Sequence, residues 1–200
     1  MIQPRLLLFD LGNVLVRFEP DRFSRSLGLN VQSAQNHYGK GVREITNLYE
    51  SGRYSTDEYF LSLRSFLKER FDIPELKKAF LSVLTDPIPG MEDLVRRATG
   101  RLSSALVSNT NEFHFTTILP RVPALKYLPK RYLSYEIGAI KPSPEFYECI
   151  KRKEDIEADE MLFIDDVEEN IVAAEHAGMV GYLFDGMERF GCHLKEIGVL

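Results

Sequence analysis

Acidic residues follow two short apolar runs that lie far apart in the chain. Asp10 comes directly after the apolar residues 6–9, and Asp165 and Asp166 come directly after residues 161–164. Hydrophobic runs of this length are typical of buried strands in a parallel sheet. Carboxylates at the C-terminal ends of such strands lie at the edge where open α/β sheets bind ligands. Since carboxylates bind hard cations and can act as nucleophiles, the sequence predicts a cation site beside a nucleophile.

The elements that must position these acids alternate between strand and helix. Beyond the run at residues 6–9, strands are predicted at 102–107, 131–135, 161–164 and 180–184, and helices at 90–99, 112–119, 144–151, 168–177 and 187–196. Alternation at these lengths implies a parallel sheet with right-handed crossovers. The predicted fold class is therefore α/β, a Rossmann-like parallel sheet flanked by helices.

Residues 18–87 show a different pattern, with apolar side chains at helical spacing. Helices are predicted at 43–51, 56–70 and 75–84, and no strand is expected in this stretch. Ser55 precedes Glu58 by three positions, which is a capping-box signature at a helix start. We therefore expect a small all-helical cap domain at 18–87, inserted after the first strand into an α/β core domain formed by 1–17 and 88–200.

Composition narrows the classes of function. The net charge of −5 argues against partners such as nucleic acid or an anionic membrane. No segment approaches the roughly 20 apolar residues of a membrane span, and the N-terminus lacks the pattern of a signal peptide. Cys149 and Cys192 are too few for a disulfide framework, so we expect a cytoplasmic protein. The oligomeric state is not predicted.

Four motifs, in order, resemble those of haloacid dehalogenase-like hydrolases. They are FDLGNVL at 9–15, VSN at 107–109, KP at 141–142, and FIDD at 163–166 with Asn170. Each lies at the end of a predicted strand or in the loop after it, and the helical stretch resembles the small type I cap of that superfamily. The chain is most similar to sugar phosphatases acting on glucose 1-phosphate and, more distantly, to the phosphatase domain of soluble epoxide hydrolase.

The resemblance implies a Mg²⁺-dependent phosphatase that hydrolyses a small phosphorylated metabolite. Asp10 would attack phosphorus and form an aspartyl-phosphate, since a carboxylate is both a nucleophile and a leaving group. Asp166, Asp10 and the backbone carbonyl of Gly12 would bind Mg²⁺, which prefers oxygen ligands and keeps several waters. Asp165 would orient one of these waters.

The remaining motifs supply phosphate contacts. Ser108 and the amide of Asn109 would bind phosphate oxygens, helped by the N-terminus of the following helix. Lys141 would neutralise charge on the transferred phosphoryl group. Arg53, in a loop between two predicted cap helices, would contact the leaving group. Asn170 would either steady the acidic loop or occupy a solvated helix position.

Position 12 departs from the family pattern. Most members carry a second aspartate two residues after the nucleophile, where it acts as general acid and base, but here that residue is Gly12. His114 is a candidate for the missing proton transfer because histidine titrates near neutral pH. Its neighbours Phe113 and Phe115 equally predict a packed histidine.

Gly12 also leaves two alternative functions open. A metal-independent haloacid dehalogenase lacks the second aspartate too, but such relatives do not keep the paired acids of the fourth motif. A non-catalytic phosphate-ligand binding or regulatory protein would explain the loss at position 12. It would not require the nucleophile, the lysine and the metal-binding acids that this chain retains.

Overall fold

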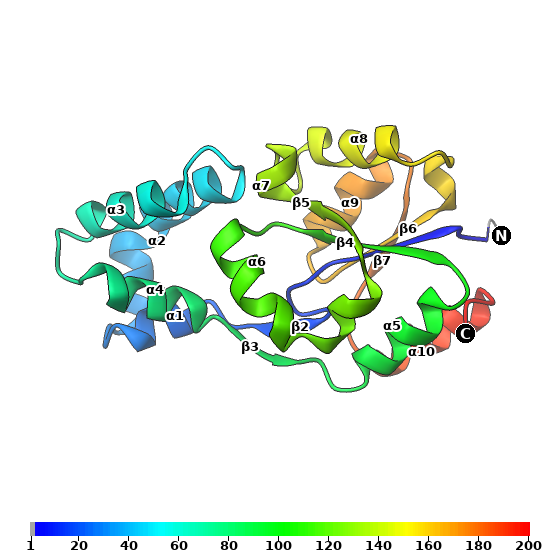
Figure 1. Cartoon of the computed structure of the whole chain (residues 1–200), viewed down its shortest axis with the longest axis horizontal. Helices are drawn as coiled ribbons and strands as arrows, with labels where there is room; N and C mark the ends of the chain where they lie inside the picture. Colours follow the sequence, from blue (N-terminus) through cyan, green and yellow to red (C-terminus); the bar gives the residue numbers. More distant parts are fainter. Residues whose placement is uncertain (1–2) are drawn as a thin grey trace.

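A five-stranded parallel sheet forms the centre of the computed structural model, which describes residues 3–200 (Figure 1). The order along the sheet is β5 (Lys130–Leu133), β4 (Ser103–Ser108), β1 (Leu6–Phe9), β6 (Met161–Asp165) and β7 (Val180–Leu183). All four neighbouring pairs run parallel. Every residue of β1 and β6 is buried, because helices cover both faces, and this accounts for their unbroken apolar runs. The predicted α/β fold is confirmed.

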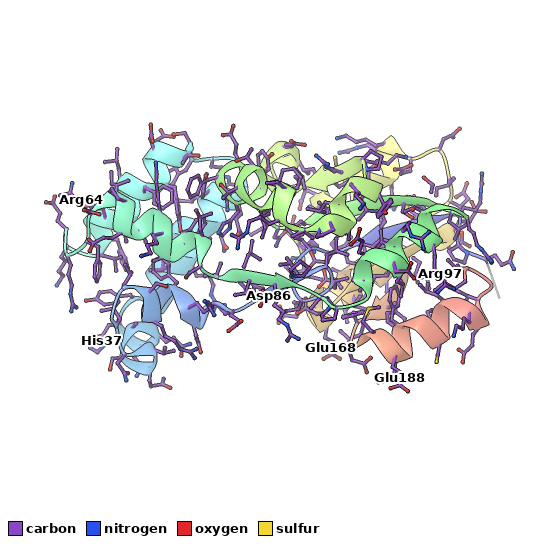
Figure 2. The ribbon with its side chains drawn as sticks, turned by 60° about the horizontal axis from the view of Figure 1, so that its bottom comes forward. His37, Arg64, Asp86, Arg97, Glu168 and Glu188 are labelled. Atoms are coloured by element: carbon purple, nitrogen blue, oxygen red, sulfur yellow. The ribbon has the colours of Figure 1, made fainter. Side chains whose placement is uncertain are left out.

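Two apolar cores lie on opposite faces of this sheet. Leu6 and Leu8 pack with residues of α8 (Pro144–Lys153) and α9 (Glu168–His176), whereas Leu7 and Phe9 pack with α5 (Met91–Thr99) and α10 (Met187–Glu196). Alternate residues of a strand face opposite sides, so one strand contributes to both cores. The side chains fill the space between the helices and the sheet (Figure 2). Short helical segments complete this part: α6 (Glu112–Ile118), α7 (Ser134–Ile137), η1 (Leu119–Arg121), η2 (Pro123–Tyr127) and η3 (Ala158–Glu160).

Four helices lie beside the sheet, beyond the ends of β1 and β4 (Figure 1). They are α1 (Asp21–Ser26), α2 (Val31–Glu50), α3 (Thr56–Phe66) and α4 (Ile73–Leu81). They share an apolar core of their own, with Tyr59, Phe60 and Leu63 at its centre. Ser55 and Glu58 form the predicted capping box at the start of α3. We propose that residues 18–87 are the cap domain, and we call these four helices the helical cap.

The longest cap helix differs most from its prediction. α2 begins at Val31, although the apolar spacing predicted a helix only from residue 43. Its first half is polar, and Gly39 and Gly41 lie near its middle, so the helical periodicity is weak there. Asn30 starts the helix by accepting a hydrogen bond from the amide of Ser33.

A two-stranded antiparallel ribbon, which the sequence did not predict, joins the cap to the sheet. β3 (Leu84–Pro87) pairs with β2 (Val16–Phe18), so the expectation of no strand between residues 18 and 87 is wrong. Both strands are short, and each finds its partner only through the tertiary fold. Two predicted helices end earlier than expected, at Phe66 and Leu81, and β5 gives way to α7 at Ser134. Within residues 3–200, none of the helices has the length and apolarity that a membrane crossing requires.

Candidate active site

The carboxyl ends of β1, β4 and β6 meet at the edge of the sheet that faces the helical cap. Asp10 follows β1, Ser108 ends β4, and Asp165 ends β6. Carboxylate oxygens of Asp10, Asp165 and Asp166 lie within 4.8 Å of one another. Parallel strands bring their C-terminal ends to one edge, so acids far apart in the sequence become neighbours.

Lys141 lies between two of these acids. Its Nζ donates to Asp10 Oδ1 at 2.7 Å and to Asp165 Oδ2 at 2.6 Å, and its side chain is only 2% exposed. Burial alone would lower the pKa of Lys141, but the two carboxylates raise it above its ordinary value. Burial raises the pKa of Asp10 to about 7, against the lowering influence of Lys141. The lysine is therefore a charged group fixed beside the carboxylate that ends β1.

Asp165 is fully occupied by protein donors. Besides Lys141, it accepts from the amide of Val167 at 2.9 Å and from Asn170 Nδ2, which lies 3.1 Å from both oxygens. Asn170 is itself buried, which favours its steadying role over a solvated helix position. Asp165 therefore orients Lys141 directly.

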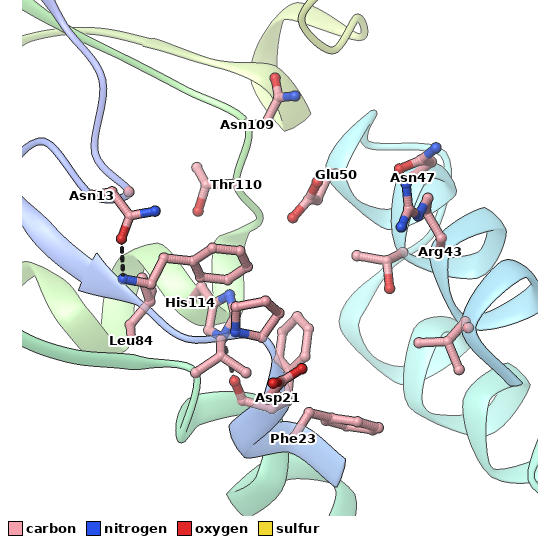
Figure 3. A pocket seen from close by; sticks show the side chains of 18 of the residues that line it. Asn13, Asp21, Phe23, Arg43, Asn47, Glu50, Leu84, Asn109, Thr110 and His114 are labelled. Carbon is pink, nitrogen blue, oxygen red and sulfur yellow. Dashed lines mark hydrogen bonds between the residues drawn. The ribbon is translucent and has the colours of Figure 1, made fainter. Parts of the chain in front are cut away.

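Asp166 is more open to the cavity. Its Oδ2 accepts from Asn13 Nδ2 at 2.8 Å, and burial raises its pKa. The Oδ1 of Asn13 accepts from the amide of Phe18 at 2.9 Å (Figure 3). Asn13 thus links β2 to the acidic loop, a role that its position in the first motif did not predict.

The side chain of Asn109 fixes the loop that carries the lysine. Its Nδ2 donates to the carbonyl of Lys141 at 2.9 Å, and its Oδ1 accepts from the amide of Lys141 at 2.8 Å. Ser108 is buried, and its Oγ donates weakly to the carbonyl of Asn109 at 3.3 Å. Both residues line the cavity described next, where the predicted phosphate contacts would be made.

A cavity of about 530 Å³ lies between the sheet edge and the helical cap. The core side contributes Asp10, Gly12, Asn13, Ser108, Asn109, Lys141, Asp165 and Asp166. The cap side includes Arg43, Asn47 and Glu50 of α2 (Figure 3). Arg53 is exposed and is not among the lining residues, so the structure does not bring it to the cavity.

His114 reaches the cavity wall but is tightly packed. Its ring stacks on Phe80 with centroids 3.9 Å apart, and its Nε2 donates to the carbonyl of Phe80 at 2.7 Å. Burial lowers the pKa of His114 to about 4. The structure therefore favours the packed histidine over the proton donor.

Glu50 is another residue of the cavity that sequence reasoning missed. It ends α2, and burial raises its pKa to about 7, with Lys141 lowering the pKa and Asp10 raising it. No motif marks this glutamate. The nearest signal is its position just before Gly52 and Arg53, the loop that was expected to face the site.

Comparison with known proteins agrees with this geometry. The sequence model of haloacid dehalogenase-like hydrolases matches residues 4–178. D-Ribitol-5-phosphate phosphatase of Bacteroides thetaiotaomicron is 27% identical over 180 residues, which cover 86% of this chain and 87% of the relative. A phosphatase of Mycobacterium tuberculosis is 28% identical over 211 residues, covering 97% and 95% of the two chains.

A solved structure extends the similarity to the fold. A haloacid dehalogenase family enzyme of Bacteroides thetaiotaomicron, crystallised with magnesium and inorganic phosphate, aligns with a TM-score of 0.74 and 25% identity. The alignment covers 90% of this chain and 93% of that enzyme. With a family match that spans most of its length, the chain belongs to the haloacid dehalogenase-like hydrolases.

Proposed function

We propose that this hydrolase is a Mg²⁺-dependent phosphatase for small phosphorylated metabolites, with sugar and polyol phosphates as the candidate substrates. The observation that carries the proposal is the buried Lys141, held between Asp10 and Asp165 with Asp166 beside them. This arrangement places a nucleophile, a fixed positive charge and hard oxygen ligands at one point. The relatives named for phosphatase activity support the same conclusion.

The acidic cluster fits a magnesium ion. Its donors are carboxylate oxygens, the ligand type that Mg²⁺ prefers. We assign Asp10, Asp166 and the carbonyl of Gly12 as the ligands, because Asp165 already accepts hydrogen bonds on both oxygens. When bound, the ion would offset the negative charge of the phosphoryl group and of Asp10.

The chain's own residues then divide the reaction. The carboxylate of Asp10 attacks phosphorus, the ester P–O bond breaks, and an aspartyl-phosphate forms. Lys141 stabilises negative charge on the phosphoryl oxygens, while Ser108 and the amide of Asn109 hold that group in place. Water then attacks the aspartyl-phosphate and releases phosphate.

The shape of the cavity supports a small polar substrate. Its volume of about 530 Å³ leaves room beyond a phosphoryl group, and Arg43 and Asn47 line the cap side. These side chains suit a hydroxylated leaving group. Motion of the helical cap would admit the substrate and exclude water.

The two alternative functions are less well supported. A metal-independent dehalogenase has no use for Asp166, which Asn13 holds at the cavity. A phosphate-binding protein could use Lys141, but it has no use for the buried carboxylate of Asp10 beside it, which would repel an anionic ligand.

The test is phosphate release from a panel of D-glucose 1-phosphate, D-ribitol 5-phosphate and p-nitrophenyl phosphate, with Mg²⁺ or with EDTA. We expect release with Mg²⁺ that disappears with EDTA and in the Asp10→Asn variant. No release above that variant from any ester, with folded protein and Mg²⁺ present, would refute the proposal for this panel and make haloacids the next compounds to test.

A further inference from the structure

Position 12, where a side chain for proton transfer would lie beside the nucleophile, is a glycine in this chain. A departing alkoxide needs a proton, and the water that attacks an aspartyl-phosphate must lose one. Gly12 lies close to the carboxylate of Asp10 in space, but its side chain is a single hydrogen atom. A Cβ built on Gly12 would lie 3.8 Å from Asp10 Oδ2 and 3.5 Å from Phe18 Cβ, so the position has room for a side chain that the sequence does not provide.

Glu50 reaches the same cavity from the opposite side. Its side chain extends from the end of α2 toward Asn109 and Thr110 of the core (Figure 3). Within residues 3–200 no hydrogen bond to its carboxylate is found, and it stands outside the cluster of three aspartates. The carboxylate is therefore free to contact a substrate.

Two contacts hold the end of α2 against the core. The hydroxyl of the buried Tyr49 accepts from the amide of Phe113 at 3.4 Å. Gly52, with a φ of +69°, approaches the carbonyl of Tyr135 so closely that an added Cβ would lie 2.3 Å from that oxygen. Glu50 lies between these two anchors, so its backbone is well fixed relative to the core.

Three other titratable residues of the cavity wall are bonded to other groups of the protein. His114 donates to a backbone carbonyl, Tyr59 is bonded to Thr46, and Asp21 is paired with Arg25. The aspartates and the lysine at the sheet edge are occupied with one another or with the metal site proposed above. Arginine does not deprotonate in proteins, which removes Arg43 as a base.

The chemistry of Glu50 suits both directions of proton transfer. Burial raises its pKa to about 7, while Lys141 lowers the pKa and Asp10 raises it by a smaller amount. Lys141, Asp10 and Tyr59 are the titratable groups that act on it from the core and from α3. A carboxyl group with a pKa near the working pH can donate a proton in one step and accept one in the next.

We propose that Glu50, on the cap, is the general acid and base of this phosphatase and carries out the proton transfers that the glycine at position 12 cannot. The inference rests on the proposed function. As the bond from phosphorus to the leaving oxygen breaks and the bond to Asp10 forms, the Glu50 carboxyl proton passes to that oxygen and yields an alcohol. The Glu50 carboxylate then takes a proton from the attacking water, the bond between phosphorus and Asp10 breaks, and phosphate leaves with Glu50 protonated again.

The experiment compares Glu50→Gln with the wild type on two esters in Mg²⁺. D-Ribitol 5-phosphate has an alcohol leaving group that needs a proton, whereas p-nitrophenyl phosphate releases a stable phenolate. Because kcat/KM reports formation of the aspartyl-phosphate, we expect a loss of about 10²–10³-fold for the alkyl ester and less than about tenfold for the aryl ester. Glu44→Gln, the same change at an exposed position of α2, is the matched control.

Two further readouts separate proton transfer from a structural effect. Slow hydrolysis of the aspartyl-phosphate in Glu50→Gln should produce a burst of p-nitrophenolate, about one per enzyme, before the steady state. Adding Gly12→Asp to Glu50→Gln should restore kcat/KM for the alkyl ester, since the new carboxylate lies beside Asp10.

The outcomes distinguish this inference from the function on which it rests. Equal losses on both esters, or no loss on either while the wild type is active, would overturn the role of Glu50 and leave the phosphatase intact. A wild-type protein that hydrolyses no ester of the panel would overturn the proposed function, and this inference with it.

Discussion

Replacement of Lys141 with methionine removes the positive charge that lies between two buried acids at the sheet edge. Methionine keeps most of the length of the lysine side chain, so the change is mainly electrostatic. Asp10 and Asp165 lose donors at 2.7 and 2.6 Å, and their side chains are only 10% and 0% exposed. Water therefore cannot readily replace the lost donors.

The expected loss of stability is large. Removing one partner of a buried ion pair costs about 3–5 kcal/mol, because a charge is left buried without compensation. Lys126 provides the comparison, since its Nζ lies 2.6 Å from Glu92 Oε1 while both side chains are about half exposed. An exposed pair contributes about 0–1 kcal/mol, so Lys126→Met should change the free energy of unfolding far less.

Acid should reduce the loss in Lys141→Met. Without the lysine, the folded-state pKa of Asp10 rises above the value of about 7 that burial already produces. A carboxyl group whose pKa is raised on folding gives stability that is present below its unfolded pKa of about 3.9 and is lost as the pH rises through the folded value. Below about pH 7 the folded carboxyl is protonated in both proteins, so the difference between variant and wild type should grow as the pH rises above about 7, where Asp10 ionises in the wild type first.

Magnesium should restore more stability to the variant than to the wild type. A cation that binds only the folded state stabilises it by mass action, and binding should be tighter where the lysine no longer repels it. The assay is urea unfolding of the wild type, Lys141→Met and Lys126→Met at pH 5 and pH 8.5, each with EDTA or Mg²⁺. Equal losses in the two variants, or a loss in Lys141→Met that does not shrink at pH 5, would refute the reasoning.

Two further predictions concern the packing around the cavity. The pKa of His114 falls from about 6.5 to about 4 on folding, so the folded protein favours the neutral imidazole. Up to about 3 kcal/mol of the free energy of unfolding should therefore be lost as the pH falls from 6.5 to 4. His114→Gln keeps a donor for the carbonyl of Phe80, so urea titrations should show a smaller fall in its free energy of unfolding over this pH range. A pH dependence equal to that of the wild type would contradict the prediction. Gly52→Ala should lower kcat/KM on the phosphate panel because its Cβ would clash with the carbonyl of Tyr135. Gly191→Ala, where a Cβ meets nothing within 4 Å, should leave activity unchanged, and equal activity of the two would contradict the close approach.

Much of the site could be predicted from the sequence because its residues lie at the ends of strands. The apolar runs before Asp10, Ser108 and Asp165 are visible in the sequence, and parallel strands must bring their ends to one edge. The cap was harder to predict in detail. Its longest helix begins in polar, glycine-containing sequence, and its ribbon depends on a pairing between β2 and β3 that local propensity does not encode.

The sequence by itself determined the sheet, the order of its motifs and the acids at its edge, since these follow from hydrophobic patterning and strand direction. Only the tertiary structure decided which cap side chain faces them. Packing of α2 against the core places Glu50, and not Arg53, at the cavity, because Gly52 lets the chain approach the carbonyl of Tyr135. Burial also lowers the pKa of His114 and raises the pKa of Glu50. Burial is a property of the assembled fold, so the sequence pattern alone does not predict these shifts.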